Sequence, residues 1–98
     1  MNRPFEIDFD FPLAHSDLII SLRATAELHH SDPYYVVDDF YVRDSKKPEL
    51  SILPSQQIKK VTRGTAKVWV HKDSGRESLL SIAIGKAIEN AMRQRKNN

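Results

Sequence analysis

Polar and apolar residues alternate strictly near the start of the chain. Over residues 5–11 every second residue is aromatic or aliphatic, and the carboxylates Glu6, Asp8 and Asp10 stand between them. Successive side chains of a β-strand point to opposite faces, so this pattern predicts a strand with one apolar and one acidic face. Pro12 ends the pattern.

The alternation continues over residues 18–29 and, with one fault, over residues 34–43. In the first segment it outweighs a fair helical propensity and predicts a second strand. The second segment is rich in aromatic and β-branched residues, which is typical of a strand. Its alternation slips at Asp38-Asp39, where a β-bulge would restore the register. Residues 30–33 predict a tight turn between the two strands.

The middle of the chain is less clear. Residues 44–49 are polar and predict an exposed loop, and residues 50–53 fit a short strand. Residues 54–61 fit either one or two helical turns or an edge strand. After Gly64 the alternation resumes and predicts a strand over residues 65–71. Its two faces hold Ala66, Val68 and Val70 on one side and Lys67, Trp69 and His71 on the other.

A helix is predicted for the rest of the chain. The segment Ser74-Gly75-Arg76-Glu77 matches a capping box, in which serine and glutamate side chains each accept a backbone N–H at the helix start. Gly85 lowers the stability of the helix by about 1 kcal/mol relative to alanine. Close approach of another backbone at this position would offset that loss. Residues 93–98 predict a frayed basic tail. The apolar stripe at helical spacing comprises Leu80, Ile84, Ala87, Ile88 and Ala91, flanked by Leu79, Ala83 and Met92.

These elements predict an α+β fold: an antiparallel β-meander of four or five strands with one long C-terminal helix packed on one face. The length fits a single domain over residues 1–98. A domain of this size has a thin core, so dimerisation would bury useful additional surface. The expected core comprises Phe5, Ile7, Phe9, Phe11, Ile20, Leu22, Leu28, Val68 and Val70 of the sheet and Leu80, Ile84, Ala87 and Ile88 of the helix.

Composition excludes several classes of site. The chain has no cysteine, which rules out disulfides, thiolate nucleophiles and Cys-ligated metal centres. It has no apolar run long enough to cross a membrane, and its acidic N-terminal segment does not resemble a signal peptide. We therefore expect a cytoplasmic protein without a membrane partner. The three glycines are too sparse for a phosphate-binding loop, and no Gly-x-Ser-x-Gly elbow is present.

Charge divides the chain into two halves. Residues 1–49 contain five basic and ten acidic side chains, a net charge of −5, whereas residues 50–98 contain ten basic and three acidic ones, a net charge of +7. Such polarity bears on partners more than on fold. The two halves can attract each other within one chain or between two copies. Alternatively, the basic half can bind a polyanion.

Two functions follow from these features. The first is a non-enzymatic interaction module that forms a homodimer or binds another protein. The alternative is a single-stranded nucleic-acid-binding domain, in which cations neutralise phosphates and an exposed Trp69 stacks on a base. A basic run is also compatible with an ordinary solvated face, and Trp69 with packing under the sheet. The candidate nucleic-acid-binding residues are Lys59, Lys60, Arg63, Lys67, Trp69, Lys72, Arg93, Arg95 and Lys96.

Catalysis has weaker support. The triplet His-x-Asp begins at His15, His30 and His71, and imidazole with carboxylate suits zinc or manganese. Asp and Ser at these positions are equally explained as turn and cap residues at strand ends. The acidic strand face has a similar simple explanation, because an antiparallel sheet has one solvated face. We therefore assign no catalytic residue, metal ligand or cofactor and expect no enzyme. The one candidate metal cluster is His29, His30, Asp32, His71 and Asp73.

Overall fold

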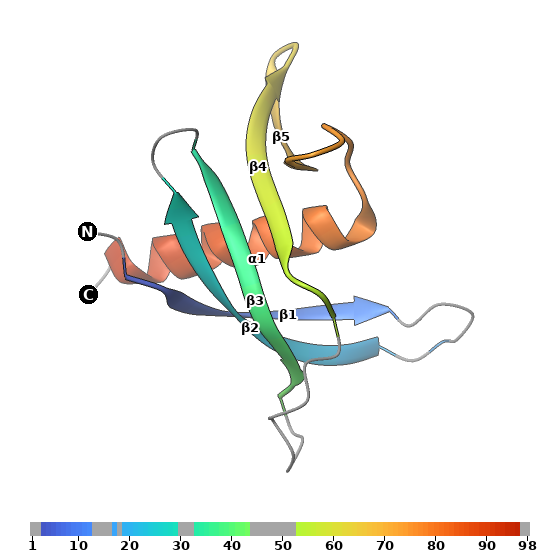
Figure 1. Cartoon of the computed structure of the whole chain (residues 1–98), viewed down its shortest axis with the longest axis vertical. Helices are drawn as coiled ribbons and strands as arrows, with labels where there is room; N and C mark the ends of the chain where they lie inside the picture. The colour runs from blue at the N-terminus through green and yellow to red at the C-terminus, as the bar shows by residue number, and fades with distance from the viewer. Residues whose placement is uncertain (1–2, 13–16, 18, 30–32, 44–52, 97–98) are drawn as a thin grey trace.

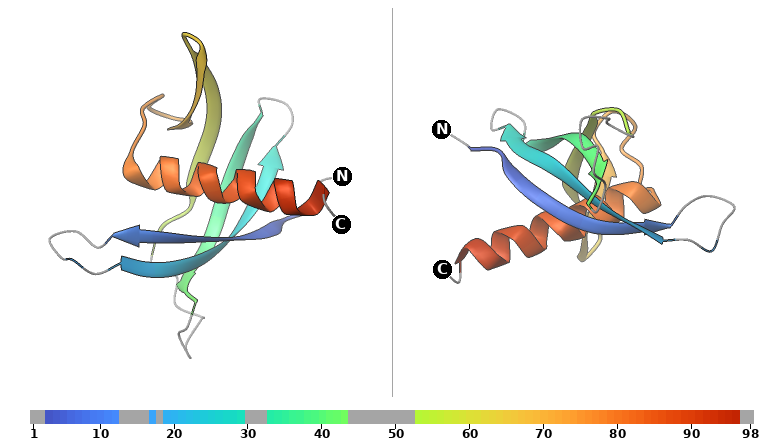
Figure 2. Two further views of the ribbon diagram at one scale, coloured as in Figure 1. Left: turned by 180° about the vertical axis from the view of Figure 1, so that it is seen from behind. Right: turned by 90° about the horizontal axis from the view of Figure 1, so that it is seen from below.

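The computed structural model describes residues 3–12, 17, 19–29, 33–43 and 53–96. Its elements in chain order are β1 (Phe5–Pro12), β2 (Ile19–His29), β3 (Tyr34–Val42), β4 (Gln56–Arg63), β5 (Ala66–His71) and α1 (Leu79–Lys96). The strands form one antiparallel sheet in the order β1-β2-β3-β4-β5. The sheet is strongly curled, and α1 crosses one of its faces (Figure 1, Figure 2).

This architecture confirms the predicted α+β meander with one C-terminal helix. Of the alternatives for residues 54–61, the strand is correct, because β4 begins at Gln56. It is not an edge strand, however, since β4 pairs with both β3 and β5. The predicted loop at 44–49 and most of the predicted strand at 50–53 lie outside the described residues, as does most of the turn at 30–33. Within the described part of the chain, no helix is both long and apolar enough to span a membrane.

A β-bulge interrupts the pairing of β2 with β3, as the sequence predicts. Opposite Ala24 the register shifts, and β3 contains one residue more than β2. Asp39 has a φ of 56°, in the left-handed region that Asn and Asp tolerate better than most residues. The extra residue allows Val37 and Phe40, which are three positions apart, both to be fully buried. The bulge therefore keeps two carboxylates in solvent without losing an inward-pointing aromatic ring.

The main core lies between the inner face of the sheet and α1. Phe5, Phe11, Ile20 and Leu80, all predicted core residues, are partly buried against it, and Leu28 is half-buried nearby. The buried cluster comprises Ile7, Phe9, Leu22, Ala24, Ala26, Val37, Phe40, Ile58, Trp69, Ile84, Ala87 and Ile88.

The sequence predicts the wrong inner face for β5. Trp69 belongs to the cluster beneath α1, whereas Val70 is 1% exposed but lies outside that cluster. Val68 shares the outer face with Val70. Alternation favours this outer face, because on the inner face Trp69 stands between Lys67 and His71. The segment after β5 returns beside the outer face, where the Gly75 carbonyl accepts a hydrogen bond from the Arg63 guanidinium.

The helix begins four residues later than the capping box at 74–77 predicts. Ser78 is the N-cap: its hydroxyl accepts the Ser81 N–H at 3.0 Å, and the Ser81 hydroxyl accepts the Ser78 N–H at 2.8 Å. This is a capping box built from two serines. Gly75 has a φ of 69°, a left-handed backbone that a helix does not contain. Ser74 instead accepts the Arg76 N–H at 3.2 Å within the preceding turn.

Gly85 is required by close packing, although its neighbour is an indole and not the predicted backbone. A Cβ atom at this position would lie 2.1 Å from Cγ of Trp69. Ser81, one turn earlier, is fully buried and donates to the Trp69 carbonyl at 3.0 Å. Two small residues thus seat α1 directly on β5.

Candidate interaction surfaces

The hairpin of β4 and β5 extends beyond the rest of the sheet as a two-stranded ribbon (Figure 1). β3 pairs with β4 only at residues 56–58, whereas β4 and β5 remain paired as far as Arg63 and Ala66. Gly64, with a φ of 62°, starts the two-residue turn that closes the ribbon. Residues 56–71 contain no carboxylate. We call this segment, with Lys59, Lys60, Arg63 and Lys67, the basic ribbon.

The predicted nucleic-acid-binding residues lie on more than one face. Lys60 and Lys67 share the side of Trp69 and α1, and Lys59 and Arg63 lie on the opposite side, because paired and alternate residues fix the direction of each side chain. Lys60 Nζ is 3.7 Å from Oε1 of Glu89. The remaining cations lie off the ribbon: Lys72 Nζ is 4.6 Å from the centre of the Tyr34 ring, Arg93 lies toward the C-terminal end of α1, and Arg95 and Lys96 belong to its last turn.

Trp69 is a core residue and not an exposed aromatic. Its side of β5 faces α1, and the residue is 8% exposed. The indole Nε1 donates to Oε1 of Glu89 at 2.6 Å, and Lys60 Nζ lies 5.5 Å from the ring centre. Of the two roles considered from the sequence, packing under the sheet is the observed one, and the buried indole is not positioned to stack on a base.

An apolar pocket of about 380 Å³ lies beside Trp69, Glu89 and Lys60. Tyr35 is tilted against Trp69 with 5.8 Å between ring centres, and burial raises the pKa of its hydroxyl. The Lys60–Glu89 pair supplies the polar part of the rim. The residues that line the pocket are Leu28, Pro33, Tyr35, Lys60, Trp69, Ile88, Glu89 and Met92.

The opposite end of the sheet carries an acidic surface. The carboxylates of β1 point outward beside Arg23 of β2, whose Nε lies 2.8 Å from Oδ1 of Asp8 and 3.2 Å from Oε2 of Glu6. The hydrogen bond from Arg23 lowers the pKa of Asp8, and the same bond raises the pKa of Arg23. Ser21 donates to Asp10 at 2.7 Å.

We call the outer surface of β1 and β2, with the adjoining part of β3, the acidic face. Its five outward-pointing carboxylates and two guanidinium groups leave a net charge of −3. Arg23 and Arg43 form ion pairs with Asp8, and Arg23 also with Glu6, while the five carboxylates are exposed, which fits a solvated face. These groups are Glu6, Asp8, Asp10, Glu27 and Asp38, with Arg23 and Arg43.

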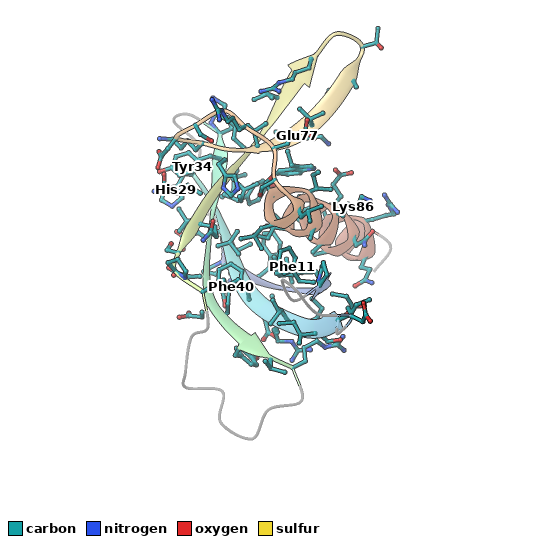
Figure 3. All side chains as sticks on the ribbon, turned by 90° about the vertical axis from the view of Figure 1, so that its right-hand side faces the viewer. Phe11, His29, Tyr34, Phe40, Glu77 and Lys86 are labelled. Carbon is teal, nitrogen blue, oxygen red and sulfur yellow. The ribbon has the colours of Figure 1, made fainter. Side chains whose placement is uncertain are left out.

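The described histidines do not assemble the candidate metal cluster. The sheet register aligns Leu28, Tyr35, Ile58 and His71 on one face, so the next residue after Leu28, His29, points to the other face. The His29 ring stacks on Tyr34 with 5.0 Å between centres (Figure 3). Among the described residues, no group of three or more His, Asp or Glu side chains is arranged to hold a metal ion. His30 and Asp32 lie outside the described residues.

One polar contact was not predicted from the sequence. His71 Nε2 lies 2.7 Å from Oγ of Ser78, the N-cap of α1. The hydroxyl also accepts the Ser81 N–H, so the contact ties the end of β5 to the start of the helix. The only sequence signal for it is the spacing Ser78-x-x-Ser81, which the neighbouring Ser74-x-x-Glu77 pattern obscures.

Comparisons with protein-family models, with curated proteins and with solved structures find no match.

Proposed function

We propose that this chain is a non-enzymatic interaction module that associates with a second copy of itself through opposite charges. One observation carries the proposal: the acidic face and the basic ribbon lie at opposite edges of one sheet, because β1 and β5 are its first and last strands. Local ion pairs, such as Arg23 with Asp8, neutralise only part of each surface. A second copy offers each surface an oppositely charged partner.

Two-fold symmetry makes this arrangement self-limiting. In a two-fold dimer the acidic face of each copy meets the basic ribbon of the other, and the same contact occurs twice. Exposed ion pairs contribute little individually and are screened by salt. The association is therefore expected to be weak and to depend strongly on ionic strength, since the Debye length falls from about 8 Å at 0.15 M salt to about 3 Å at 1 M.

Sedimentation equilibrium at high micromolar concentration tests the dimer. We expect a mass above the monomer at about 50 mM salt, where screening is weaker than at 0.15 M, and a return to the monomer mass as salt approaches 1 M. The ribbon variant (Lys59→Glu with Lys67→Glu) and the acidic-face variant (Glu6→Lys with Asp10→Lys) should each be monomeric.

Mixing the two variants supplies the decisive control. In the mixed dimer the reversed ribbon meets the reversed acidic face, while the two unchanged surfaces meet each other, so heterodimers should form. Arg93→Glu, a charge reversal away from the ribbon, should leave the parent association unchanged. A parent chain that stays monomeric at all salt concentrations, or a mixture that fails to associate, would overturn the proposal.

A second candidate is binding of single-stranded nucleic acid by the same ribbon. It is favoured by the absence of carboxylates from residues 56–71, together with the extension of the ribbon beyond the rest of the sheet. Cations on both faces of a narrow ribbon can neutralise phosphates that pass along either side.

Fluorescence anisotropy with labelled single- and double-stranded oligonucleotides at about 50 mM salt tests this candidate. We expect micromolar or weaker binding to single strands, with a log–log salt slope of about −0.7 per neutralised phosphate. The ribbon variant should weaken binding to all sequences alike, since phosphate contacts carry no base information. The acidic-face variant separates the two functions, because it should abolish the dimer but bind the oligonucleotide at least as well. Absence of binding would exclude nucleic acid as the ligand.

A further inference from the structure

The outer edge of β1 ends the sheet. Among the described residues, β1 is paired along its length with β2, and no strand lies on its other side. Alternate residues of an edge strand direct their N–H and C=O groups away from the sheet, where they can pair with another chain. The opposite edge is different near its end, because His71 N–H donates to the Arg76 carbonyl and its own carbonyl accepts from Gly75.

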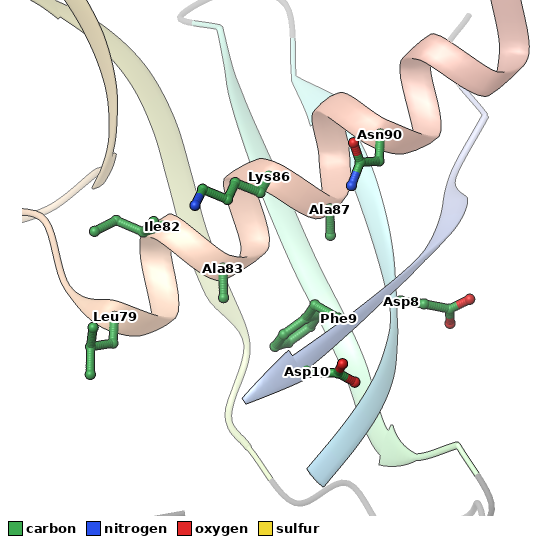
Figure 4. Close-up of a pocket in the computed structure, with 9 residues that line it drawn as sticks. All are labelled: Asp8, Phe9, Asp10, Leu79, Ile82, Ala83, Lys86, Ala87 and Asn90. Atoms are coloured by element: carbon green, nitrogen blue, oxygen red, sulfur yellow. The ribbon is translucent and has the colours of Figure 1, made fainter. Parts of the chain in front are cut away.

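A groove runs between β1 and α1 (Figure 4). It consists of a pocket of about 300 Å³ and a second of about 170 Å³, and the two share Asp8, Ala87 and Asn90. The side chains of Ala83 and Ala87 point from the helix toward β1, and Phe9 points from β1 toward the helix (Figure 4). The groove therefore follows the strand. The larger pocket has a largely apolar floor, whereas the smaller one is lined mainly by polar and charged residues.

The helix offers further apolar surface beside this groove. Leu79 is 70% exposed and lines the groove together with Ile82 and Ala83. A strand added to β1 would direct every second side chain toward these three residues. The inward positions beside these residues would therefore be apolar.

The carboxylates of β1 favour basic residues at the outward-pointing positions of an added strand. The other side chains of an added strand would lie beside Glu6, Asp8 and Asp10, and oppositely charged neighbours stabilise such cross-strand pairs. Glu6 is more open than Asp8, with 65% of its side chain exposed against 41%. A second copy is a poor occupant, because antiparallel pairing of two β1 edges would bring the carboxylates of both strands together.

We propose that the groove between β1 and α1 binds an extended segment of another protein, in which apolar residues alternate with Lys or Arg. The segment adds to β1 as a further antiparallel or parallel strand, so backbone hydrogen bonds supply affinity and the alternating side chains supply specificity. This surface is separate from the basic ribbon and does not depend on self-association.

The test uses a fluorescein-labelled peptide of alternating Lys and Val, capped at both ends and matched to the eight residues of β1. We expect saturable binding by anisotropy to the parent chain and to the ribbon variant. A peptide of the same composition with the lysines and valines in separate blocks should bind at least tenfold more weakly, because it cannot present two distinct faces. Leu79→Ser should weaken binding about tenfold or more through lost apolar contact. Met92→Ser, on the other side of α1 and 39% exposed, should change it less than twofold.

Amide hydrogen exchange identifies the mode of binding. Strand addition should slow exchange at alternate residues of β1 only, because only alternate amides face the free edge. Equal binding of the two peptides, absence of binding, or binding without slowed exchange in β1 would overturn the proposal. Slowed exchange of these amides in the free chain that grows with protein concentration would assign the edge to a second copy and would also overturn it.

Discussion

Replacing Trp69 with Ala should lower the free energy of unfolding by about 3–5 kcal/mol. The indole is the largest side chain between β5 and α1, and it donates a hydrogen bond to Glu89 in addition to filling that space. Its removal leaves a cavity and also removes that hydrogen bond. Urea denaturation followed by far-UV circular dichroism measures the loss, since Trp69 is the only tryptophan and its fluorescence disappears with it. A loss below about 1 kcal/mol would show that the indole does not fill this space.

Gly85→Ala tests the same contact from the helix. Helical propensity alone favours alanine by about 1 kcal/mol. The new Cβ would overlap the indole, so we expect the variant to be destabilised by about 1–3 kcal/mol. In the Trp69→Ala background the space is open, and the same substitution should become neutral or stabilising. An increase in stability in the parent chain would show that α1 is not seated on Trp69.

Replacing Ile84 with Ala should cost about 2–5 kcal/mol. Ile84 is fully buried on the side of α1 that faces the sheet. Truncation to alanine therefore buries less apolar surface on folding and leaves a cavity in the core. Leu79→Ala is the matched control, because Leu79 lies on the same helix but is 70% exposed. Its effect should stay within about 0.5 kcal/mol. Chemical denaturation of both variants gives the comparison, and a cost below about 0.5 kcal/mol for Ile84 would contradict packing by this stripe.

The contrast between core and surface matters for the functional tests. The ribbon, acidic-face and groove variants change exposed or half-buried side chains, so they are expected to retain most of the parent stability. Loss of association in these variants can therefore be attributed to the altered surface once their unfolding curves match the parent. Trp69 does not offer this separation, which is why the nucleic-acid test relies on lysines.

The acidic face also links the two interaction proposals. The basic residues of a bound strand would lie beside Glu6, Asp8 and Asp10, which are the groups that meet the basic ribbon in the proposed dimer. A peptide in the groove is therefore expected to compete with self-association.

Elements whose two faces differ in polarity could be predicted from the amino-acid sequence. β1 has aromatic and aliphatic residues on one face and carboxylates on the other, so a single strand register satisfies it. The bulge in β3 was predictable for the same reason, because Asp38-Asp39 interrupts an otherwise regular alternation. The buried helix stripe around Ile84 follows from spacing alone. These are local patterns in which burying the wrong face would put charge into the core.

The inner face of β5, the start of the helix and the two surfaces could not be predicted in this way. In β5 the alternation favours the face of Val68 and Val70, and the choice of Trp69 as the inner residue depends on Gly85 and Ser81, which lie farther along the chain. The helix start was ambiguous between two similar capping patterns, and the left-handed backbone at Gly75 together with the contact of His71 with Ser78 selects the later one. The charge imbalance was visible in the sequence, but its separation into two surfaces comes from the order of strands. The groove is lined by residues of the first strand, β1, and of the C-terminal helix, α1, which are distant in sequence. Such features depend on contacts between residues distant in sequence, and local periodicity contains no information about which distant segments meet.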